Sequence, residues 1–437
     1  MGSINSLACA SLLSWTLLES ASVIASSLSC TLGPEEGSDV QNALNRRTFW
    51  NRDFLLFWLG SMQSELATAV AGVAFSFLVL EQTGKASSMG ITLALSLLPS
   101  IFAPLMGAWI DRLPLKPPLI LGNLLRAGLM GVVAYMAFTD QFSLGVVYLI
   151  SLINGLVDMF YTPASQSVFP TLVPPEELQR ASGYMGMASQ GMQLVGLVGG
   201  GFLVGVLGSG FAIAWNAVAL LVMSLLLLFV ALPVRAPRTE KTHLLQDTRA
   251  ALQLVKQSAP LRFLMLLTFV AAGVFAPLEL MVPKIMLAAG QGSRGYGLFF
   301  GTMMGAMLLG SALVATGVLK ASPRAMMFWG LLGMVLAFVL LSFSSVLPMV
   351  YASAGVLGLG IAVAQTAATV LEAQSIPEDF RGRVFSLYAA VAALSMPVVL
   401  LLVSAVIDHV PVSVVALACA AGMLLLAVMQ KSWLGLR

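Results

Sequence analysis

Twelve apolar runs, each long enough to cross a lipid bilayer as a helix, dominate this sequence. A membrane-spanning helix needs about 20 predominantly apolar residues. A polar stretch at 233–260 separates six such runs from six more. We therefore predict an all-α membrane protein with twelve transmembrane helices in two six-helix bundles. The runs cover approximately residues 54–80, 88–110, 118–138, 142–164, 183–206, 210–232, 261–288, 296–319, 325–345, 348–371, 384–407 and 411–430.

The composition excludes several other classes of protein. Hydrophobic residues make up 59% of the chain and charged residues only 9%, too few charges to cover a soluble surface. A net charge of +3 is too small to indicate a nucleic-acid partner. The three cysteines and two histidines form no metal-binding spacing. The sequence also lacks GxSxG, HExxH, CxxC and Walker-lysine motifs, so we predict no enzyme activity, no metal and no cofactor.

The placement of basic residues predicts the orientation in the membrane. Loops on the cytoplasmic side of a membrane protein carry an excess of Lys and Arg. If both termini are cytoplasmic, 18 of the 22 Lys and Arg residues lie in cytoplasmic segments. The four exceptions are Lys85, Arg126, Lys284 and Arg294. We therefore expect a multi-pass protein of the cell membrane, with a lipid bilayer around it and both termini inside.

The same pattern predicts the organisation of the chain. Residues 1–45 are rich in Ser and contain no Lys or Arg, and we predict a disordered extension, with a thirteenth helix as the alternative. An N-terminal bundle then covers 46–232, a basic cytoplasmic linker 233–260, and a C-terminal bundle with a short tail 261–437. We expect the protein to be a monomer.

A short charged turn between the second and third apolar runs carries the first motif. It reads Gly-Ala-Trp-Ile-Asp-Arg-Leu-Pro-Leu-Lys, from Gly107 to Lys116. A glycine lets helix backbones approach closely, and Asp111 can accept hydrogen bonds at a helix start or pair with a cation. Arg112 and Lys116 hold the turn on the cytoplasmic side. This turn resembles the G-x-x-x-D-R-x-G-R-R loop of the major facilitator superfamily, whose members are transporters with six plus six helices.

Two further stretches resemble the macrolide-efflux and enterobactin-exporter branch of that superfamily. One begins at Pro163 and reads PASQSVFPTLVPPEELQRAS, and the other reads RGRVFS. The resemblance covers about residues 46–430. We predict that the start of the second stretch, Arg381, Gly382 and Arg383, forms the cytoplasmic gate or holds a helix end and does not bind the substrate. In the fifth run, a remnant of the glycine motif of exporters also indicates efflux, although close helix packing is the alternative explanation. The matching glycines are Gly183, Gly196, Gly200 and Gly201.

Charged side chains inside the membrane indicate where function resides. A buried charge is costly in hydrocarbon and usually faces a cavity or a partner. Three carboxylates qualify, Glu65, Asp158 and Glu279, and Gln365 adds a mid-span polar group. The resemblance implies that their four helices line a central cavity. We predict that these residues bind a proton or the substrate; the alternative is a structural role, such as pairing with Arg126.

Together these features predict a secondary transporter that exports an amphipathic small molecule of the drug, macrolide or siderophore class. Proton antiport with alternating access is the expected mechanism, because burial disfavours a charged carboxylate and so favours proton uptake. The partners are then the substrate, protons and the bilayer. The alternative is a lipid or lysophospholipid flippase of the same fold. A non-transporting receptor is disfavoured because the sequence shows no soluble domain.

Overall fold

The structure, a computed structural model, describes residues 50–102, 114–232, 252–317, 321–377 and 380–433. These residues are almost entirely helical, and the described part of the chain contains no β-strand. In the first half the helices are α3 (Arg52–Thr83), α4 (Ala86–Leu97) continued by the 3-10 helix η1 (Leu98–Phe102), α6 (Lys116–Phe138), α7 (Leu144–Leu172), the 3-10 helix η2 (Pro175–Glu177), α8 (Leu178–Leu207) and α9 (Ser209–Phe229).

The second half repeats this plan. Its helices are α11 (Ala259–Gly273), α12 (Phe275–Ala288), α13 (Gly292–Ala315), α14 (Pro323–Ser342), α15 (Leu347–Ser375), α16 (Arg381–Ser404) and α17 (Val412–Trp433). Among the described residues, eleven helical stretches are long and apolar enough to cross a membrane, with α11 and α12 counted as one. A shorter apolar helix at Ala86–Phe102 covers the described part of the second predicted span. This agrees with the predicted all-α membrane fold.

Local sequence signals explain where several helices begin and end. The side chain of Asn51 accepts a hydrogen bond of 2.8 Å from the backbone N–H of Phe54 and so caps the start of α3. The same helix ends at Gly84, whose φ of 67° lies in the left-handed region that glycine adopts without strain. The seventh span breaks between Gly273 and Phe275 because Pro277 has no N–H to donate to the carbonyl of Gly273.

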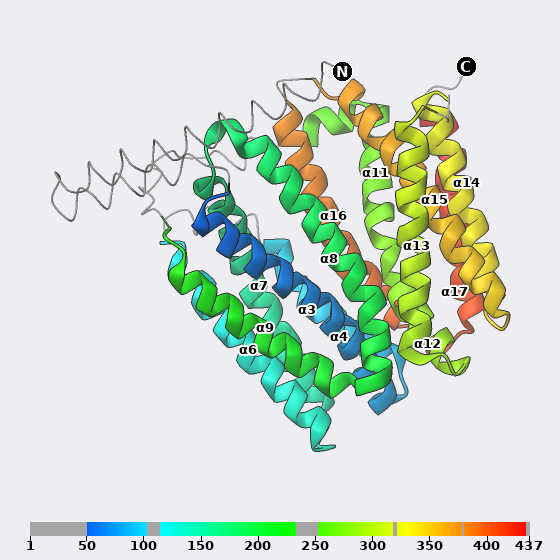
Figure 1. Ribbon diagram of the computed structural model, residues 1–437. Coiled ribbons are helices and arrows are strands. Elements are labelled where there is room, and N and C mark those ends of the chain that lie inside the picture. The colour runs from blue at the N-terminus through cyan, green and yellow to red at the C-terminus, as the bar shows by residue number, and fades with distance from the viewer. Residues whose placement is uncertain (1–49, 103–113, 233–251, 318–320, 378–379, 434–437) are drawn as a thin grey trace, which may run out of the picture.

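The helices form two bundles that lie side by side, one from α3 to α9 and one from α11 to α17 (Figure 1). We call the end where α3 begins and α17 ends the Arg52 end, and the other the Asp408 end. In Figure 1 the bundles converge toward the Asp408 end at the bottom and lean apart toward the top. Contacts between bundles at the Asp408 end include Ser293 Oγ, which donates to the carbonyl of Gly201 over 2.9 Å.

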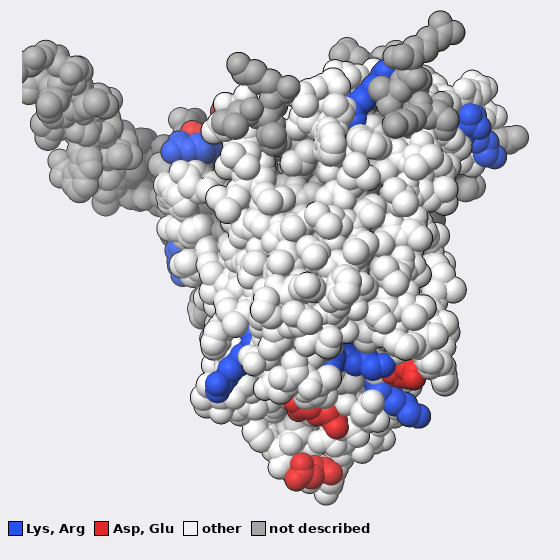
Figure 2. Space-filling model, turned by 90° about the vertical axis from the view of Figure 1, so that its right-hand side faces the viewer, with Lys and Arg blue, Asp and Glu red and all other residues white. Residues whose placement is uncertain are grey.

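The molecular surface supports a membrane setting. Figure 2 shows a broad uncharged band between Lys, Arg, Asp and Glu side chains gathered toward the two ends. Many large apolar side chains are exposed, among them Phe138, Phe229 and Trp329. Such side chains are stable when they face lipid rather than water.

Some predicted boundaries differ from the observed ones. The fourth span continues as α7 to Leu172, eight residues beyond the predicted limit, because Pro163 and Pro170 are accommodated inside the helix. The predicted extension at 1–45 and most of the linker at 233–260 lie outside the described residues, although residues 252–257 are helical.

Candidate functional site

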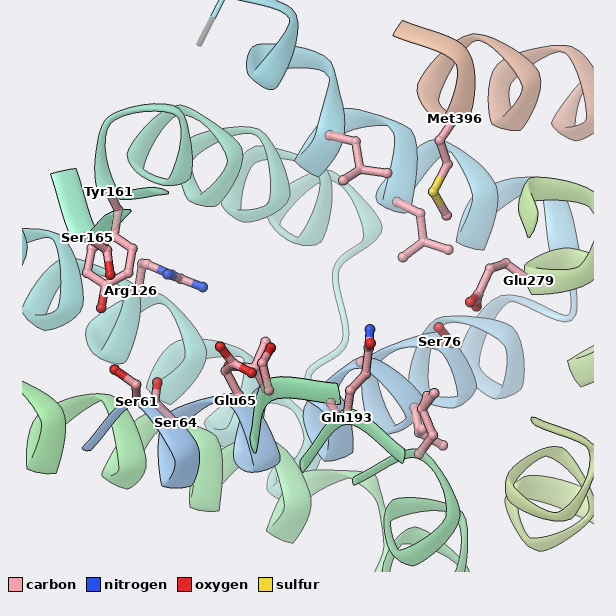
Figure 3. Close-up of a pocket in the computed structure, with 18 of the residues that line it drawn as sticks. Ser61, Ser64, Glu65, Ser76, Arg126, Tyr161, Ser165, Gln193, Glu279 and Met396 are labelled. Carbon is pink, nitrogen blue, oxygen red and sulfur yellow. The ribbon is translucent and has the colours of Figure 1, made fainter. Parts of the chain in front are cut away.

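A cavity of about 560 Å³ lies between the two bundles. Helices α3, α4, α6, α7 and α8 of the first bundle line it, together with α12, α13 and α16 of the second. Figure 3 shows Glu65, Gln193 and Arg126 directed into this space from the first bundle, with Glu279 across from them. The lining mixes polar and apolar side chains, as an amphipathic ligand would require.

One face of α3 forms much of the cavity wall. Ser61, Glu65, Thr68, Gly72 and Ser76 all line the cavity. Steps of three and four residues place them on one side of an α-helix. The wall therefore carries small or polar groups around one carboxylate, and this pattern could have been found in the sequence.

The second predicted carboxylate, Asp158, has a fixed partner. Its Oδ1 lies 3.3 Å from a terminal nitrogen of Arg126. Arg126 Nε also donates to Asn154 Oδ1 over 3.2 Å, and the guanidinium lies over the ring of Tyr161, 5.3 Å from its centroid. Arg126 lines the cavity, but its positive charge is balanced by Asp158. The structure thus contains the pairing that the sequence offered as the structural alternative.

This pair gives a testable expectation for stability. Asp158→Asn alone leaves Arg126 without its ion-pair partner, so we expect a lower melting temperature than for Asp158→Asn combined with Arg126→Gln. Contacting residues couple by about 0.5–3 kcal/mol, and a surface-accessible pair belongs near the lower limit. The Asp158 side chain is 47% exposed, so we expect a coupling energy near this lower limit. Thermal unfolding in detergent of the wild type, both single variants and the double variant measures the coupling, and strictly additive effects would contradict it.

The third carboxylate, Glu279, lies on the opposite bundle. Its Oε2 accepts a hydrogen bond of 2.8 Å from the hydroxyl of Tyr296 on α13. The Tyr296 ring also packs edge-on against Phe77 of α3, with centroids 5.8 Å apart, and so touches the first bundle. Within the described part of the chain, no Lys or Arg pairs with Glu279. Glu279 therefore faces the cavity as a carboxylate held by a neutral donor.

Gln365 does not join the other three predicted residues. It lines a different cavity of about 420 Å³ within the second bundle, together with Thr369 and Glu372 of the same helix. The spacing 365, 369 and 372 places these groups on one face of α15. We expected the four polar residues to line one cavity. In the structure Glu65 and Glu279 line the central cavity, whereas Gln365 lines the cavity within the second bundle.

The turn motif is only partly described. Gly107, Asp111 and Arg112 lie outside the described residues. Lys116 Nζ donates to the carbonyls of Leu228 and Val230, over 2.7 and 3.0 Å. These carbonyls are at the end of α9, where a helix attracts a cation. Lys116 therefore ties α6 to α9 inside the first bundle.

The RGR stretch starts α16. Arg381 is the first residue of that helix, and the Arg383 guanidinium lies 5.5 Å from the centroid of the Phe380 ring. An added Cβ at Gly382 would meet nothing within 4 Å. The stretch lies at the Arg52 end and does not line the central cavity. This position agrees with a role at a helix end.

The four motif glycines have different surroundings. An added Cβ at Gly196 would lie 2.5 Å from Ala69 Cβ, and one at Gly200 would lie 2.9 Å from Val70 Cα, so both pack against α3. At Gly201 it would lie 2.5 Å from the Ser293 carbonyl oxygen and 2.9 Å from Gly297 Cα, both across the bundle interface. At Gly183 nothing lies within 4 Å. Close packing therefore explains three of these glycines.

Sequence reasoning missed several residues of the cavity. Tyr161, Gln193 and Tyr296 all line it, but tyrosine and glutamine are common enough in membrane helices that they gave no distinct signal. Glu372, which lines the other cavity, was also missed, because it lies one turn from the end of α15, where a charge is ordinary. Among the described residues no group of three or more His, Cys, Asp or Glu could hold a metal ion.

Comparison with known proteins decides the family. The profile of the Major Facilitator Superfamily matches residues 57–321. The chain belongs to this superfamily. It is similar to macrolide efflux protein A of Streptococcus pyogenes, with 23% identity over 380 residues, 83% of this chain and 91% of the relative. It is also similar to the multidrug efflux pump Tap of Mycolicibacterium fortuitum, with 24% identity over 392 residues, 86% of this chain and 94% of the pump.

Solved structures show the same fold. The nucleoside transporter NupG superposes with a TM-score of 0.67 at 12% identity, covering 88% of this chain and 100% of that one. The match to the family profile and the similarity to efflux proteins make this protein a multi-pass membrane transporter and not an enzyme.

Proposed function

We propose that this transporter exports an amphipathic cation of the drug or macrolide class across the cell membrane in exchange for protons. The observation that carries this proposal is the pair of carboxylates that face one cavity from opposite bundles, Glu65 from α3 and Glu279 from α12. The names of the two relatives, a macrolide efflux protein and a multidrug efflux pump, support efflux as the direction.

The charge balance of the cavity favours a cation. Arg126 and Asp158 offset each other, whereas Glu65 and Glu279 have no basic partner in the described part of the chain. The ionised cavity is then negative and attracts an ammonium group. Leu93, Leu97 and Leu197 offer an apolar wall for the rest of the molecule. A protonated amine on an apolar body combines these two features.

The proposed cycle uses competition for the carboxylates. With the cavity open to the cytoplasm, the substrate cation binds and displaces protons. The bundles then rock, and the cavity opens to the outside, where protonation of the carboxylates releases the cation. The distribution of Lys and Arg supports a cytoplasmic Arg52 end. With that end inside, the bundles lean apart on the cytoplasmic side, as expected for an inward-facing transporter (Figure 1).

Transport into inverted membrane vesicles tests this proposal. An acid-interior gradient should drive accumulation of a cationic macrolide in vesicles with the protein, and collapsing the gradient with an ionophore should abolish it. Macrolide accumulation of the same size with and without the pH gradient would overturn the proposed proton coupling. A second arm offers a fluorescent lysophospholipid; its movement without any macrolide accumulation would favour a flippase instead.

A further inference from the structure

An aspartate of one bundle caps a helix of the other at the Asp408 end. The backbone N–H of Ala86 donates to Asp408 Oδ1 over 3.1 Å, and that of Ser87 donates to Oδ2 over 3.0 Å. Ala86 and Ser87 are the first residues of α4, in the first bundle. Asp408 belongs to the loop between α16 and α17, in the second bundle. Both oxygens of one carboxylate thus bridge the interface between bundles.

The start of α4 has no cap of its own. Lys85 occupies the N-cap position, and its side chain forms no capping hydrogen bond. The first N–H groups of a helix lack partners within the helix, and the helix dipole favours a negative charge there. Asp408 supplies both the acceptors and the charge. It acts as an N-cap provided by a different part of the fold.

Lys284 holds this carboxylate in place from within the second bundle. Its Nζ lies 3.6 Å from Asp408 Oδ1 and donates over 2.7 Å to the carbonyl of Ile407. Lys284 lies near the end of α12, the helix that also carries Glu279. The loop of Asp408 is therefore held against α12, the second half of the seventh span. The Asp408 side chain is 21% exposed, so solvent competes only partly for these bonds.

Helix packing directly inside this contact is close. An added Cβ at Gly90 of α4 would lie 2.0 Å from Ser404 Oγ of α16 and 3.0 Å from the Leu280 side chain of α12. The polar bridge at Asp408 therefore lies close to a tight helix contact between the same two bundles. Alternating access requires both to separate when the cavity opens at this end.

We propose that Asp408 is a gate latch, which holds the Asp408 end closed through the capped start of α4 and releases once in each transport cycle. This proposal rests on the proposed alternating access. It also takes the Arg52 end to be cytoplasmic, which places Asp408 on the outer side of the membrane. It differs from the coupling carboxylates because it binds neither substrate nor transported proton. Its effect is on the ratio of the two conformations.

Thiol accessibility on each side tests the latch without any transport assay. On a background in which Cys9, Cys30 and Cys419 are replaced by Ser, one reporter is Ser76→Cys, at the buried Asp408 side of the cavity. The other is Ser61→Cys, nearer the Arg52 end. A membrane-impermeant thiol reagent is applied to whole cells for the first reporter and to inverted vesicles for the second.

Removal of the latch should change the two reporters in opposite directions. Loss of two charge-assisted hydrogen bonds should raise the labelling rate at Ser76→Cys by roughly 10- to 100-fold in Asp408→Ala and lower that at Ser61→Cys. Asp408→Asn, which keeps an acceptor but loses the charge, should fall between wild type and Asp408→Ala. The matched control is Asp140→Asn, an exposed carboxylate in the loop after α6 at the same end.

Unchanged labelling in both Asp408 variants would overturn the latch. So would an increase at both reporters in Asp408→Asn, since that indicates a loosened fold and not a shifted gate. Because labelling needs no substrate, a shifted gate in a protein that ignores the pH gradient would leave the latch standing and remove the proton coupling.

The stability of the closed latch should not change with external pH in the physiological range, because Asp408 stays ionised there. Burial by itself would raise the pKa of Asp408, but hydrogen bonds from Ser87 and Ala86 and the Lys284 ammonium outweigh it, so the pKa falls below its usual 3.8. A carboxyl with a lowered pKa in the closed state contributes fully above its ordinary pKa and loses its contribution only below it. The charged and titratable groups beside it are Lys284, which pairs with Asp408, Lys85, which precedes Ala86, and His409, the next residue in the chain. The ratio of the Ser76→Cys labelling rates in wild type and in Asp408→Ala is therefore expected to be the same at an external pH of about 5.5 and of about 8, because the pH dependence of thiolate formation cancels in the ratio. A ratio that approaches one at the lower pH would contradict it.

Discussion

Glu279→Gln is expected to abolish gradient-driven accumulation in vesicles, down to the level of membranes without the protein. The amide oxygen of Gln can still accept the hydrogen bond that Tyr296 donates to Glu279 over 2.8 Å, so the local packing is kept. The variant loses the ability to bind and release a proton at this position and one of the two negative charges that attract the cation, while Glu65 keeps the other. A transporter without that exchange can still equilibrate its substrate but cannot concentrate it.

The measurement therefore needs two readouts on the same vesicles. Accumulation under an acid-interior gradient should disappear, while exchange of labelled for unlabelled substrate without a gradient should persist. Tyr296→Phe serves as a control, since it removes the hydrogen bond but leaves the carboxylate, and it should retain measurable accumulation. Accumulation of wild-type size in Glu279→Gln would show that the coupling group lies elsewhere, and Glu65→Gln would then be examined in the same way.

Gly201→Ala is expected to have the second large effect, through the contact between bundles. The added Cβ would lie 2.5 Å from the carbonyl oxygen of Ser293 and 2.9 Å from Gly297 Cα, and these backbone atoms cannot rotate away. Overpacking of this kind costs about 1–3 kcal/mol, which shifts a two-state equilibrium by roughly 5- to 150-fold. The closed Asp408 end should open, and transport should fall accordingly.

A matched control comes from the same motif. Gly183→Ala adds the same methyl group to the same helix, where nothing lies within 4 Å. It should leave both the labelling of Ser76→Cys and macrolide accumulation at wild-type values. If Gly201→Ala also behaved as wild type, the bundles would have to adjust at this crossing without penalty, contrary to the close backbone approach.

Much of the fold could be predicted from the sequence because crossing a membrane is a local requirement. Each helix must satisfy its own backbone hydrogen bonds in lipid, so a run of apolar residues is nearly sufficient evidence for a helix. The kink in the seventh span was equally accessible, since Pro277 removes a hydrogen bond that only its own helix could make. The extension of α7 to Leu172 was missed because prolines can be accommodated inside membrane helices.

The candidate site was predicted less completely. Glu65 and Glu279 do face one cavity, but Asp158 pairs with Arg126 and Gln365 faces another cavity. Hydropathy locates a polar residue along a helix, whereas its neighbours depend on how that helix is rotated and on what packs against it.

The sequence by itself determined that the chain forms apolar membrane helices and approximately where they lie, because each is a property of about 20 consecutive residues in lipid. Only the tertiary structure decided which side chains meet. Asp408 and Ala86 are 322 positions apart, and their hydrogen bond exists because two separate bundles bring a loop and a helix start together. No local sequence pattern predicts this contact, because it results from the packing of all the helices between the two residues.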